Sequence, residues 1–341
     1  MTTGYVFHPL YLEHNIPGHP ERRERLQRIM QSLESSGTLA RLTSIEATPL
    51  DQELLSTMHD PDYINMVEMV AASGGGMLDP DTYVNAHSYE AALMAAGGLI
   101  NAVEAVLKGQ VDNAFALVRP PGHHALRDRG MGFCLFNNVA LAAQYAMEKH
   151  GLSRILIADF DVHHGNGTQD AFYERDDVLY FSTHQYPHYP GTGHWKEKGQ
   201  GRGEGYTVNV PLPCGVGDEG YAQVFEEILL PLARRYNPEL ILVSAGYDAH
   251  WADPLAGMRL STAGFHGLTT TLVSLAEELC RGRLVLTLEG GYDLSALSHS
   301  VLATFAALRR EQAQDPLGPA PGRSPSIDDL LQNVKGIHHL A

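Results

Sequence analysis

Two aspartates and two histidines lie within six consecutive positions of the stretch ILIADFDVHHGNG, residues 155–167, directly after an apolar run typical of a buried strand. Because side chains alternate between the faces of a strand, Asp159, Asp161 and His163 are expected on one face and His164 on the other. An aspartate and a histidine two positions apart can both reach one zinc ion. The alternative is a buried ion-pair network that only closes the strand. Four clustered ionisable groups favour the metal site, because burying several charges without a cation is costly.

Further polar groups follow other apolar runs, where an open α/β sheet binds its ligands. Asp248 ends LILVSAGYD as Asp161 ends its own run, and it can supply the third protein ligand of a catalytic zinc site. RPPGHHA contributes His123 and His124, and LTLEGGYDL contributes Tyr292. A zinc ion polarises a carbonyl, a histidine moves a proton and a tyrosine hydroxyl stabilises an oxyanion. Together these groups predict amide hydrolysis.

The elements that must position these groups alternate between strand and helix patterns. NAFALVRP precedes NNVALAAQYAMEKHG, ELILVSAGYD precedes FHGLTTTLVSLAEELC, and RLVLTLEGGYD precedes LSHSVLATFAALRR. This alternation predicts an α/β fold with a mainly parallel sheet and helices on both faces. The N-terminal third is more helical, with a helix predicted from Pro20 to Gly37. The Gly-rich residues 191–205 are interpreted as a loop, because the motifs on both sides of them converge on one site.

Composition narrows the classes of partner. A formal net charge of −16 disfavours direct binding to nucleic acid or to an anionic membrane, and it either suits a cationic partner or only maintains solubility. The three cysteines are too few and too scattered for a disulfide framework or a thiolate zinc site. No uninterrupted apolar stretch approaches the ~18 residues of a membrane span, and residues 1–20 lack the features of a secretory signal. We therefore expect a cytoplasmic protein.

The motifs RPPGHHA, GFCLFNN, DFDVHHGNGTQ, YPGTG, VSAGYDAHWADPL and LEGGYDL occur in this order. In them the sequence resembles the zinc-dependent histone deacetylase family, which includes bacterial histone deacetylase-like amidohydrolases and acetylpolyamine amidohydrolases. The resemblance spans roughly residues 5–310. It implies an arginase/deacetylase-type α/β domain of about eight strands, placed here at residues 1–312. Residues 313–341 would then be a Pro-rich extension, in which IDDLLQNVKGIHH is expected to form a short docking helix.

The resemblance also implies a role for each residue that matches a catalytic motif. The zinc ligands would be Asp161, His163 and Asp248, the same three that the strand ends indicate. The remaining catalytic residues would be His124 as general base and then acid, a protonated His123 with Asp159 as its carboxylate partner, Asn166 beside His124, and Tyr292 as oxyanion donor. Asn166 matches the class II branch, whereas class I has Asp at this position.

Cation and substrate sites are implied in the same way. One or two structural potassium ions are expected, the nearer held by Asp159 and the Ser182–Thr183 region. The substrate tunnel would be lined by Gly132, Phe133, Tyr189 and Leu255. Family members commonly have Phe at the position of Tyr189, and the polyamine-preferring branch has Glu at that of Leu255. Arg25 matches an arginine that lines the acetate exit channel, and its alternative is a solvated charge on a helix.

The expected activity is zinc-dependent removal of acetyl or other short acyl groups from ε-N-acyl-lysine in a protein or peptide. Two alternatives stay open: deacetylation of a small acetylated amine such as an acetylpolyamine, and a non-catalytic module that only binds acyl-lysine. The apolar Leu255 cannot pair with a second cationic amine, which favours acyl-lysine. The sequence does not specify the acyl length or whether the chain forms a homo-oligomer.

Overall fold

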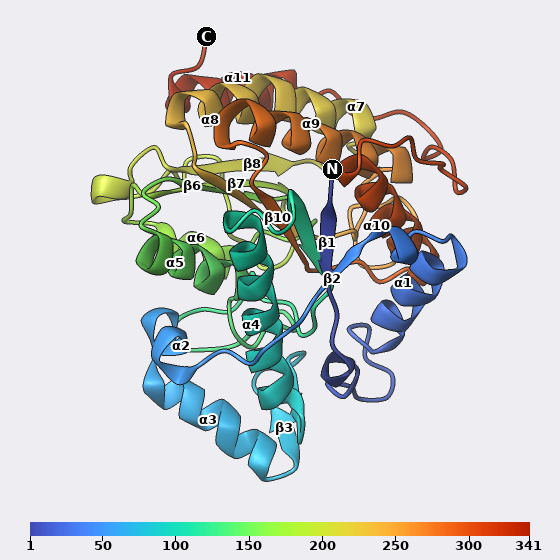
Figure 1. Cartoon of the computed structure of the whole chain (residues 1–341). Helices are drawn as coiled ribbons and strands as arrows, with labels where there is room; N and C mark the ends of the chain where they lie inside the picture. Colours follow the sequence, from blue (N-terminus) through green and yellow to red (C-terminus); the bar gives the residue numbers. More distant parts are fainter.

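Eight strands form one sheet in the computed structural model, which describes residues 1–341 (Figure 1). The strand order is β2-β1-β5-β10-β9-β6-β7-β8, and every neighbouring pair is parallel. The strands are β1 (Thr3–Val6), β2 (Thr43–Ile45), β5 (Asn113–Ala116), β6 (Ile155–Asp159), β7 (Val178–Gln185), β8 (Thr207–Leu212), β9 (Leu240–Ala245) and β10 (Leu284–Leu288). The prediction of a mainly parallel sheet of about eight strands is confirmed.

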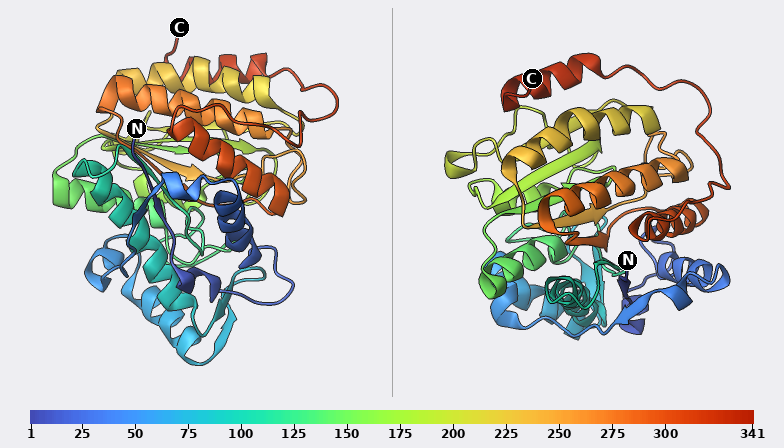
Figure 2. Two further views of the ribbon diagram at one scale, coloured as in Figure 1. Left: turned by 45° about the vertical axis from the view of Figure 1, so that its right-hand side comes forward. Right: turned by 45° about the horizontal axis from the view of Figure 1, so that its top comes forward.

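Helices cover both faces of this sheet, as predicted (Figure 1). One face carries α4 (Ser88–Leu107), α5 (Asn138–His150) and α6 (Asn166–Phe172). The opposite face carries α7 (Asp218–Val224), a π-helical turn (Phe225–Leu229), α8 (Leu230–Tyr236), α9 (Thr262–Cys280), α10 (Leu294–Leu308) and α11 (Asp328–His338). Figure 2 shows the same two layers from other directions. Strands covered on both sides must be apolar throughout, which explains the continuous apolar runs in the sequence.

The remaining elements lie beside this core. They are α1 (Glu24–Ser35), α2 (Gln52–Met58), α3 (Pro61–Ala72), the antiparallel strands β3 (Gly75–Met77) and β4 (Tyr83–Asn85), and 3₁₀ turns at Pro9–Leu12, Leu39–Arg41 and Gly201–Gly203. Helix α1 packs against α10. The Gly-rich residues 191–205 connect β7 to β8 within the one sheet, so they form a loop inside the domain.

Helix α1 begins four residues later than the prediction from Pro20. The Glu21 side chain is fully buried and forms ion pairs with Arg25 and Arg119. Nδ1 of His19 accepts from the N–H of Glu21 at 3.1 Å, and Nε2 donates to the carbonyl oxygen of Asp81 at 3.0 Å. These contacts hold residues 19–23 outside the helix, and local sequence periodicity contains no information about them.

Helix α4 is long and apolar enough to cross a membrane by length and composition alone, with a mean hydropathy of 1.4 over its best window. The sequence prediction overlooked it because Glu90 and Glu104 interrupt its apolar residues. In the structure, 67% of that window is buried inside the protein, where α4 packs against α5 and β5. Such burial is typical of a helix in the core of a folded protein.

The C-terminal residues fold back along the protein. The segment predicted as a docking helix forms α11, which packs against β8 and the π-helical turn. Its His338 side chain is 2% exposed, and neither ring nitrogen has a hydrogen-bond partner. Burial, together with the nearby charge of Arg235, lowers the pKa of His338 to about 4.

We expect His338→Leu to stabilise the protein in acid. The pKa of His338 is lower in the folded chain than its ordinary 6.5, so unfolding takes up a proton between these values and stability falls as pH drops from about 6.5 toward 4. At pH 5 the cost is about 2 kcal/mol. Leucine removes this cost without breaking a hydrogen bond. Thermal unfolding should show that His338→Leu is more stable than the wild type at pH 5 and gains much less at pH 8. An equal gain in stability at both pH values would show that protonation of His338 is not the cause.

Candidate active site

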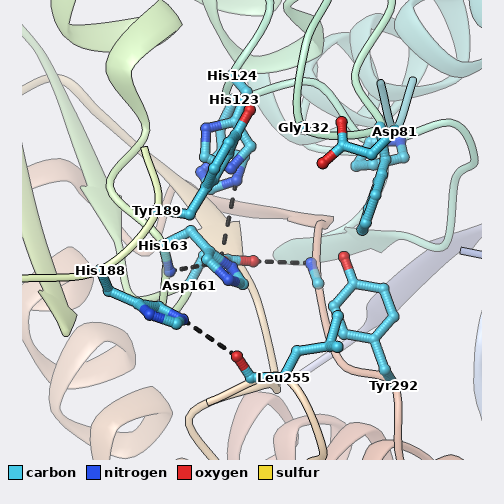
Figure 3. A pocket seen from close by; sticks show the side chains of 13 residues that line it. Asp81, His123, His124, Gly132, Asp161, His163, His188, Tyr189, Leu255 and Tyr292 are labelled. Carbon is cyan, nitrogen blue, oxygen red and sulfur yellow. Dashed lines mark hydrogen bonds and ion pairs between the residues drawn. The ribbon is translucent and has the colours of Figure 1, made fainter. Parts of the chain in front are cut away.

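The polar groups that follow four adjacent strands meet at one edge of the sheet. Strands β5, β10, β9 and β6 are neighbours in this order, and their carboxyl ends lead to His123–His124, Tyr292, Asp248 and Asp161. All of them except Asp248 line a pocket of about 240 Å³ (Figure 3), and Asp248 lies directly beside the pocket residue His163. The lining residues are Asp81, Pro121, His123, His124, Gly132, Phe133, Asp161, His163, His188, Tyr189, Leu255, Gly290 and Tyr292. All four strands are far apart in the sequence, and the topology of the sheet makes them neighbours.

The three predicted metal ligands lie together. Nδ1 of His163 is 3.1 Å from Oδ1 of Asp161 and 3.2 Å from Oδ2 of Asp248. One donor atom from each residue lies within 4.8 Å of the others. The second oxygen of each carboxylate is already engaged, by the Gly290 N–H at 2.8 Å and by the Val162 N–H at 2.9 Å. The carboxylates are therefore fixed with one oxygen each directed toward the imidazole.

The donor set fits a zinc ion. Oδ2 of Asp248 is buried and makes no hydrogen bond, which is costly for a carboxylate oxygen unless a cation or proton compensates it. Two carboxylate oxygens and one imidazole nitrogen are ordinary zinc ligands and leave a fourth position free. A Cβ atom at Gly290 would overlap the carboxylates of both Asp248 and Asp161, so only glycine lets the chain pass this close to them.

His123 carries a positive charge. Its Nδ1 donates to Oδ2 of Asp159 at 3.0 Å, and its Nε2 lies 3.9 Å from Oδ1 of Asp161. Burial alone would lower the pKa of His123, but these carboxylates outweigh it and raise the pKa to about 10. The ring of His123 is therefore a fixed cation at neutral pH.

His124 is neutral and has one nitrogen free to accept a proton. Burial and the positive charge of His123, 4.0 Å away between ring centroids, hold the pKa of His124 well below its usual value. Its Nδ1 lies 2.8 Å from Oδ1 of Asn166, whose amide nitrogen contacts the His124 carbonyl oxygen instead. An amide oxygen can only accept, so Nδ1 carries the hydrogen and Nε2 is left unprotonated. A neutral imidazole in this tautomer is a general base.

Tyr292 lies across the pocket from the histidine pair (Figure 3). Burial raises the pKa of its phenol well above the usual value, so the hydroxyl stays protonated and can donate a hydrogen bond. The Arg25 guanidinium lies 5.0 Å from the ring centroid and donates to the carbonyl oxygens of Gly291 and Glu289. The Tyr292 hydroxyl can therefore donate a hydrogen bond into the pocket, and the buried Arg25 side chain holds the backbone next to it.

The residues predicted to line a substrate tunnel all line this pocket: Gly132, Phe133, Tyr189 and Leu255. Gly132 and Phe133 have φ values of 55° and 70°, a left-handed conformation that is unfavourable for Phe133 by roughly 1 kcal/mol or more. The Phe133 N–H donates to Oγ1 of Thr82 at 3.1 Å, which helps to maintain it. A Cβ atom at Gly132 would collide with the His124 ring, so glycine lets the chain pass directly beside this ring.

Comparison with known proteins identifies the family. Residues 19–308 match the family described as "Histone deacetylase domain". The chain belongs to the histone deacetylase family. A probable deacetylase of Archaeoglobus fulgidus is 46% identical over 312 residues, covering 90% of this chain and 86% of that protein.

Other relatives match a similar share of this chain but differ in their own length. The histone deacetylase-like amidohydrolase of Pseudomonas aeruginosa is 42% identical, covering 88% of this chain and 80% of that protein. The human polyamine deacetylase HDAC10 is 41% identical over 92% of this chain, which matches 48% of HDAC10. The crystal structure of the HDA15 HD domain superposes with a TM-score of 0.92 at 38% identity, covering 99% of this chain and 96% of that one.

Not every residue that the family resemblance nominated lines the pocket. Asp159, Asn166 and Asp248 do not line it: Asp159 contacts the pocket residues His123 and Asp161, Asn166 contacts His124, and Asp248 contacts His163. Arg25 is fully buried in α1, so the alternative of a solvated helix charge is wrong. The interpretation of Ser182, Thr183 and Asp159 as potassium ligands stays a prediction: all three are buried, and Oγ1 of Thr183 has no hydrogen-bond partner. His164 lies outside the pocket and contacts Thr192 and Gln169.

Sequence reasoning missed three groups at the site. Asp81 lines the pocket, and His188 stacks on His163 with ring centroids 5.1 Å apart. Glu289 accepts hydrogen bonds from the backbone N–H groups of Gly122 and His123 at 2.7 and 3.3 Å. A charged residue at the end of an apolar run signalled Asp161, and the same signal marks Glu289. Asp81 and His188 lie in loops whose composition gives no such signal.

Proposed function

We propose that the protein is a zinc-dependent deacylase that removes acetyl or another short acyl group from ε-N-acyl-lysine. Membership of the histone deacetylase family establishes the coarser class of deacetylases and amidohydrolases. The observation that carries the finer proposal is the neutral His124 facing the Asp161, His163 and Asp248 cluster, with the Tyr292 hydroxyl opposite. These are a base, a metal cradle and an oxyanion donor around one small pocket.

Different residues of this chain would carry out the separate tasks of amide hydrolysis. Asp161, His163 and Asp248 would hold Zn²⁺, which supplies a Lewis acid that polarises the carbonyl and makes water acidic near neutral pH. Nε2 of His124 accepts the proton of the attacking water and then donates it to the leaving lysine amine. The Tyr292 hydroxyl donates a hydrogen bond to the oxygen that becomes negative.

The positive charge of His123 has two effects in this reaction. It stabilises negative charge that develops in the pocket. It also disfavours a second cation on its neighbour, so that protonated His124 transfers its proton readily to the leaving amine. The neutral Asn166 fixes the ring of His124 without adding a carboxylate that would hold the proton there.

The shape of the tunnel favours an acylated lysine. Phe133, Tyr189 and Leu255 offer apolar surface on which the four methylenes of lysine are buried favourably. Leu255 offers no negative charge for the second amine of a polyamine. The relative HDAC10 is named a polyamine deacetylase, which supports acetylpolyamine as the second candidate substrate.

A direct comparison tests the substrate. We expect kcat/KM for an acetyl-lysine peptide to exceed that for acetylspermidine or acetylputrescine, and Leu255→Glu to shift the ratio about tenfold toward the polyamine, ~1.4 kcal/mol, because it adds a charge that pairs with the second amine. Leu255→Gln is the matched control, with similar size and no charge. A wild-type preference for the polyamine above about tenfold would overturn the acyl-lysine proposal. Binding of the peptide without turnover of either substrate would favour the non-catalytic alternative.

A further inference from the structure

A buried carboxylate outside the pocket connects two loops that build it. Asp253 is 6% exposed and does not line the pocket. Its Oδ2 accepts from the N–H groups of Tyr292 and Asp293, at 2.6 and 3.1 Å. Its Oδ1 accepts from the N–H of Leu255 at 3.0 Å. One side chain therefore holds the loop that carries the oxyanion donor against the loop that carries the tunnel wall.

The chain that carries Tyr292 has no rigid local structure of its own. It follows β10 through Gly290 and Gly291, and Gly291 has a φ of 115°. Such a segment needs outside contacts to fix the direction of the tyrosine. It receives them from two sides: Arg25 donates to the carbonyl oxygens before Tyr292, and Asp253 accepts from the N–H groups at and after it. The guanidinium of Arg25 thus binds carbonyl groups of this segment, and the carboxylate of Asp253 binds its N–H groups.

Asp253 also contacts the start of α10 and is linked through Leu255 to His188. Asp293 caps α10 by accepting from the N–H of Ala296 at 2.8 Å, so its hydrogen bond to Asp253 ties the helix cap to the same carboxylate. On the other side, the carbonyl oxygen of Leu255 lies 3.1 Å from Nε2 of His188. A series of hydrogen bonds therefore links Tyr292 through Asp253 and Leu255 to His188.

We propose that Asp253 is a positioning residue for Tyr292, whose carboxylate holds the phenol in the orientation that donates to the oxyanion. A carboxylate buried to this degree is costly, and three backbone N–H donors on separate functional loops offset the cost. The kinetic test of this inference rests on the proposed deacylase function. The hydrogen-exchange test rests only on the geometry of the hydrogen bonds.

The test compares two substitutions in two backgrounds. Asp253→Ala removes all three acceptor contacts, so we expect kcat to fall about 10- to 100-fold with a smaller change in KM, because the phenol acts in the transition state. Asp253→Asn keeps one oxygen that can still accept from Tyr292 and Asp293, and it should restore most of kcat. Combined with Tyr292→Phe, Asp253→Ala should lower kcat less than about twofold further, because no hydroxyl is left to position.

A matched control separates positioning from stability. Asp218 also joins two segments through a carboxylate, which accepts from the N–H and hydroxyl of Ser261 at 2.7 and 2.6 Å, but it does not line the pocket. Asp218→Ala should lower the melting temperature and leave kcat within about twofold. If Asp253→Ala lowered kcat equally with and without the Tyr292 hydroxyl, the role of Asp253 would be general stability and the proposal would fail.

Hydrogen exchange makes the inference independent of turnover. The amides of Tyr292 and Asp293 should exchange at least about tenfold faster in Asp253→Ala than in the wild type, whereas Asp218→Ala should leave them unchanged. If the wild-type protein hydrolysed no acylated amine, the proposed function would fail while exchange still tested the positioning. Unchanged exchange in Asp253→Ala would overturn the inference even in an active enzyme.

Discussion

Tyr292→Phe is expected to reduce kcat about 10²- to 10³-fold, equivalent to about 2.7–4 kcal/mol of transition-state stabilisation, with little change in KM. The substitution removes a hydroxyl that burial keeps protonated and that lies across the pocket from the base. The contacts that fix the segment run through its backbone to Asp253 and through Arg25, so the ring should keep its place.

Steady-state kinetics on an acetyl-lysine peptide provide the measurement, with thermal unfolding to verify that the fold is intact. Tyr189→Phe is a matched control, because it removes a hydroxyl from the opposite wall of the same pocket. It should change kcat far less than Tyr292→Phe does. Near wild-type turnover by Tyr292→Phe would show that the oxyanion is stabilised elsewhere.

His124→Ala is expected to lower kcat about 10²- to 10⁴-fold, because it removes the group that takes a proton from water and returns it to the amine. His124 is a neutral ring whose tautomer is fixed by the side-chain amide of Asn166, which leaves Nε2 free to take the proton. His123 cannot replace it, since its pKa is raised to about 10 and its proton is held by Asp159.

The pH profile of Asn166→Asp checks this assignment without removing the base. A carboxylate at this position would stabilise protonated His124 and raise its pKa. The neutral, active form would then appear only at higher pH, and the acidic limb of kcat/KM should shift upward. A profile that does not move, or full activity in His124→Ala, would remove His124 from the role of base.

The sheet and the metal cluster could be predicted from sequence because both depend on local signals. Apolar runs reveal strands, and Asp161 and Asp248 mark their carboxyl ends, which parallel topology brings together. His123, His124 and Tyr292 follow the carboxyl ends of two further strands, so they could be assigned to the site in the same way. The order of the strands was not needed, only the fact that the strand ends share one edge.

Other features depend on contacts between segments far apart in the chain, which periodicity does not record. Arg25 has the spacing of a surface helix charge, yet it is buried against Glu21 and the carbonyl oxygen of Gly291, 266 residues away. Asp253 resembles an ordinary turn residue in ADPL until its bonds to Tyr292 and Asp293 are seen. Asp81 and His188 reach the pocket on loops, so their side chains could not be assigned to it from sequence.

Metal dependence tests the central claim most directly. The account predicts that protein stripped with a chelator loses turnover of an acetyl-lysine peptide, and that about one equivalent of Zn²⁺ per chain restores it. Asp248→Ala, which removes one of the three donors, should bind Zn²⁺ far more weakly and recover little activity. Full turnover by metal-free protein, or undiminished Zn²⁺ binding and activity in Asp248→Ala, would contradict the account.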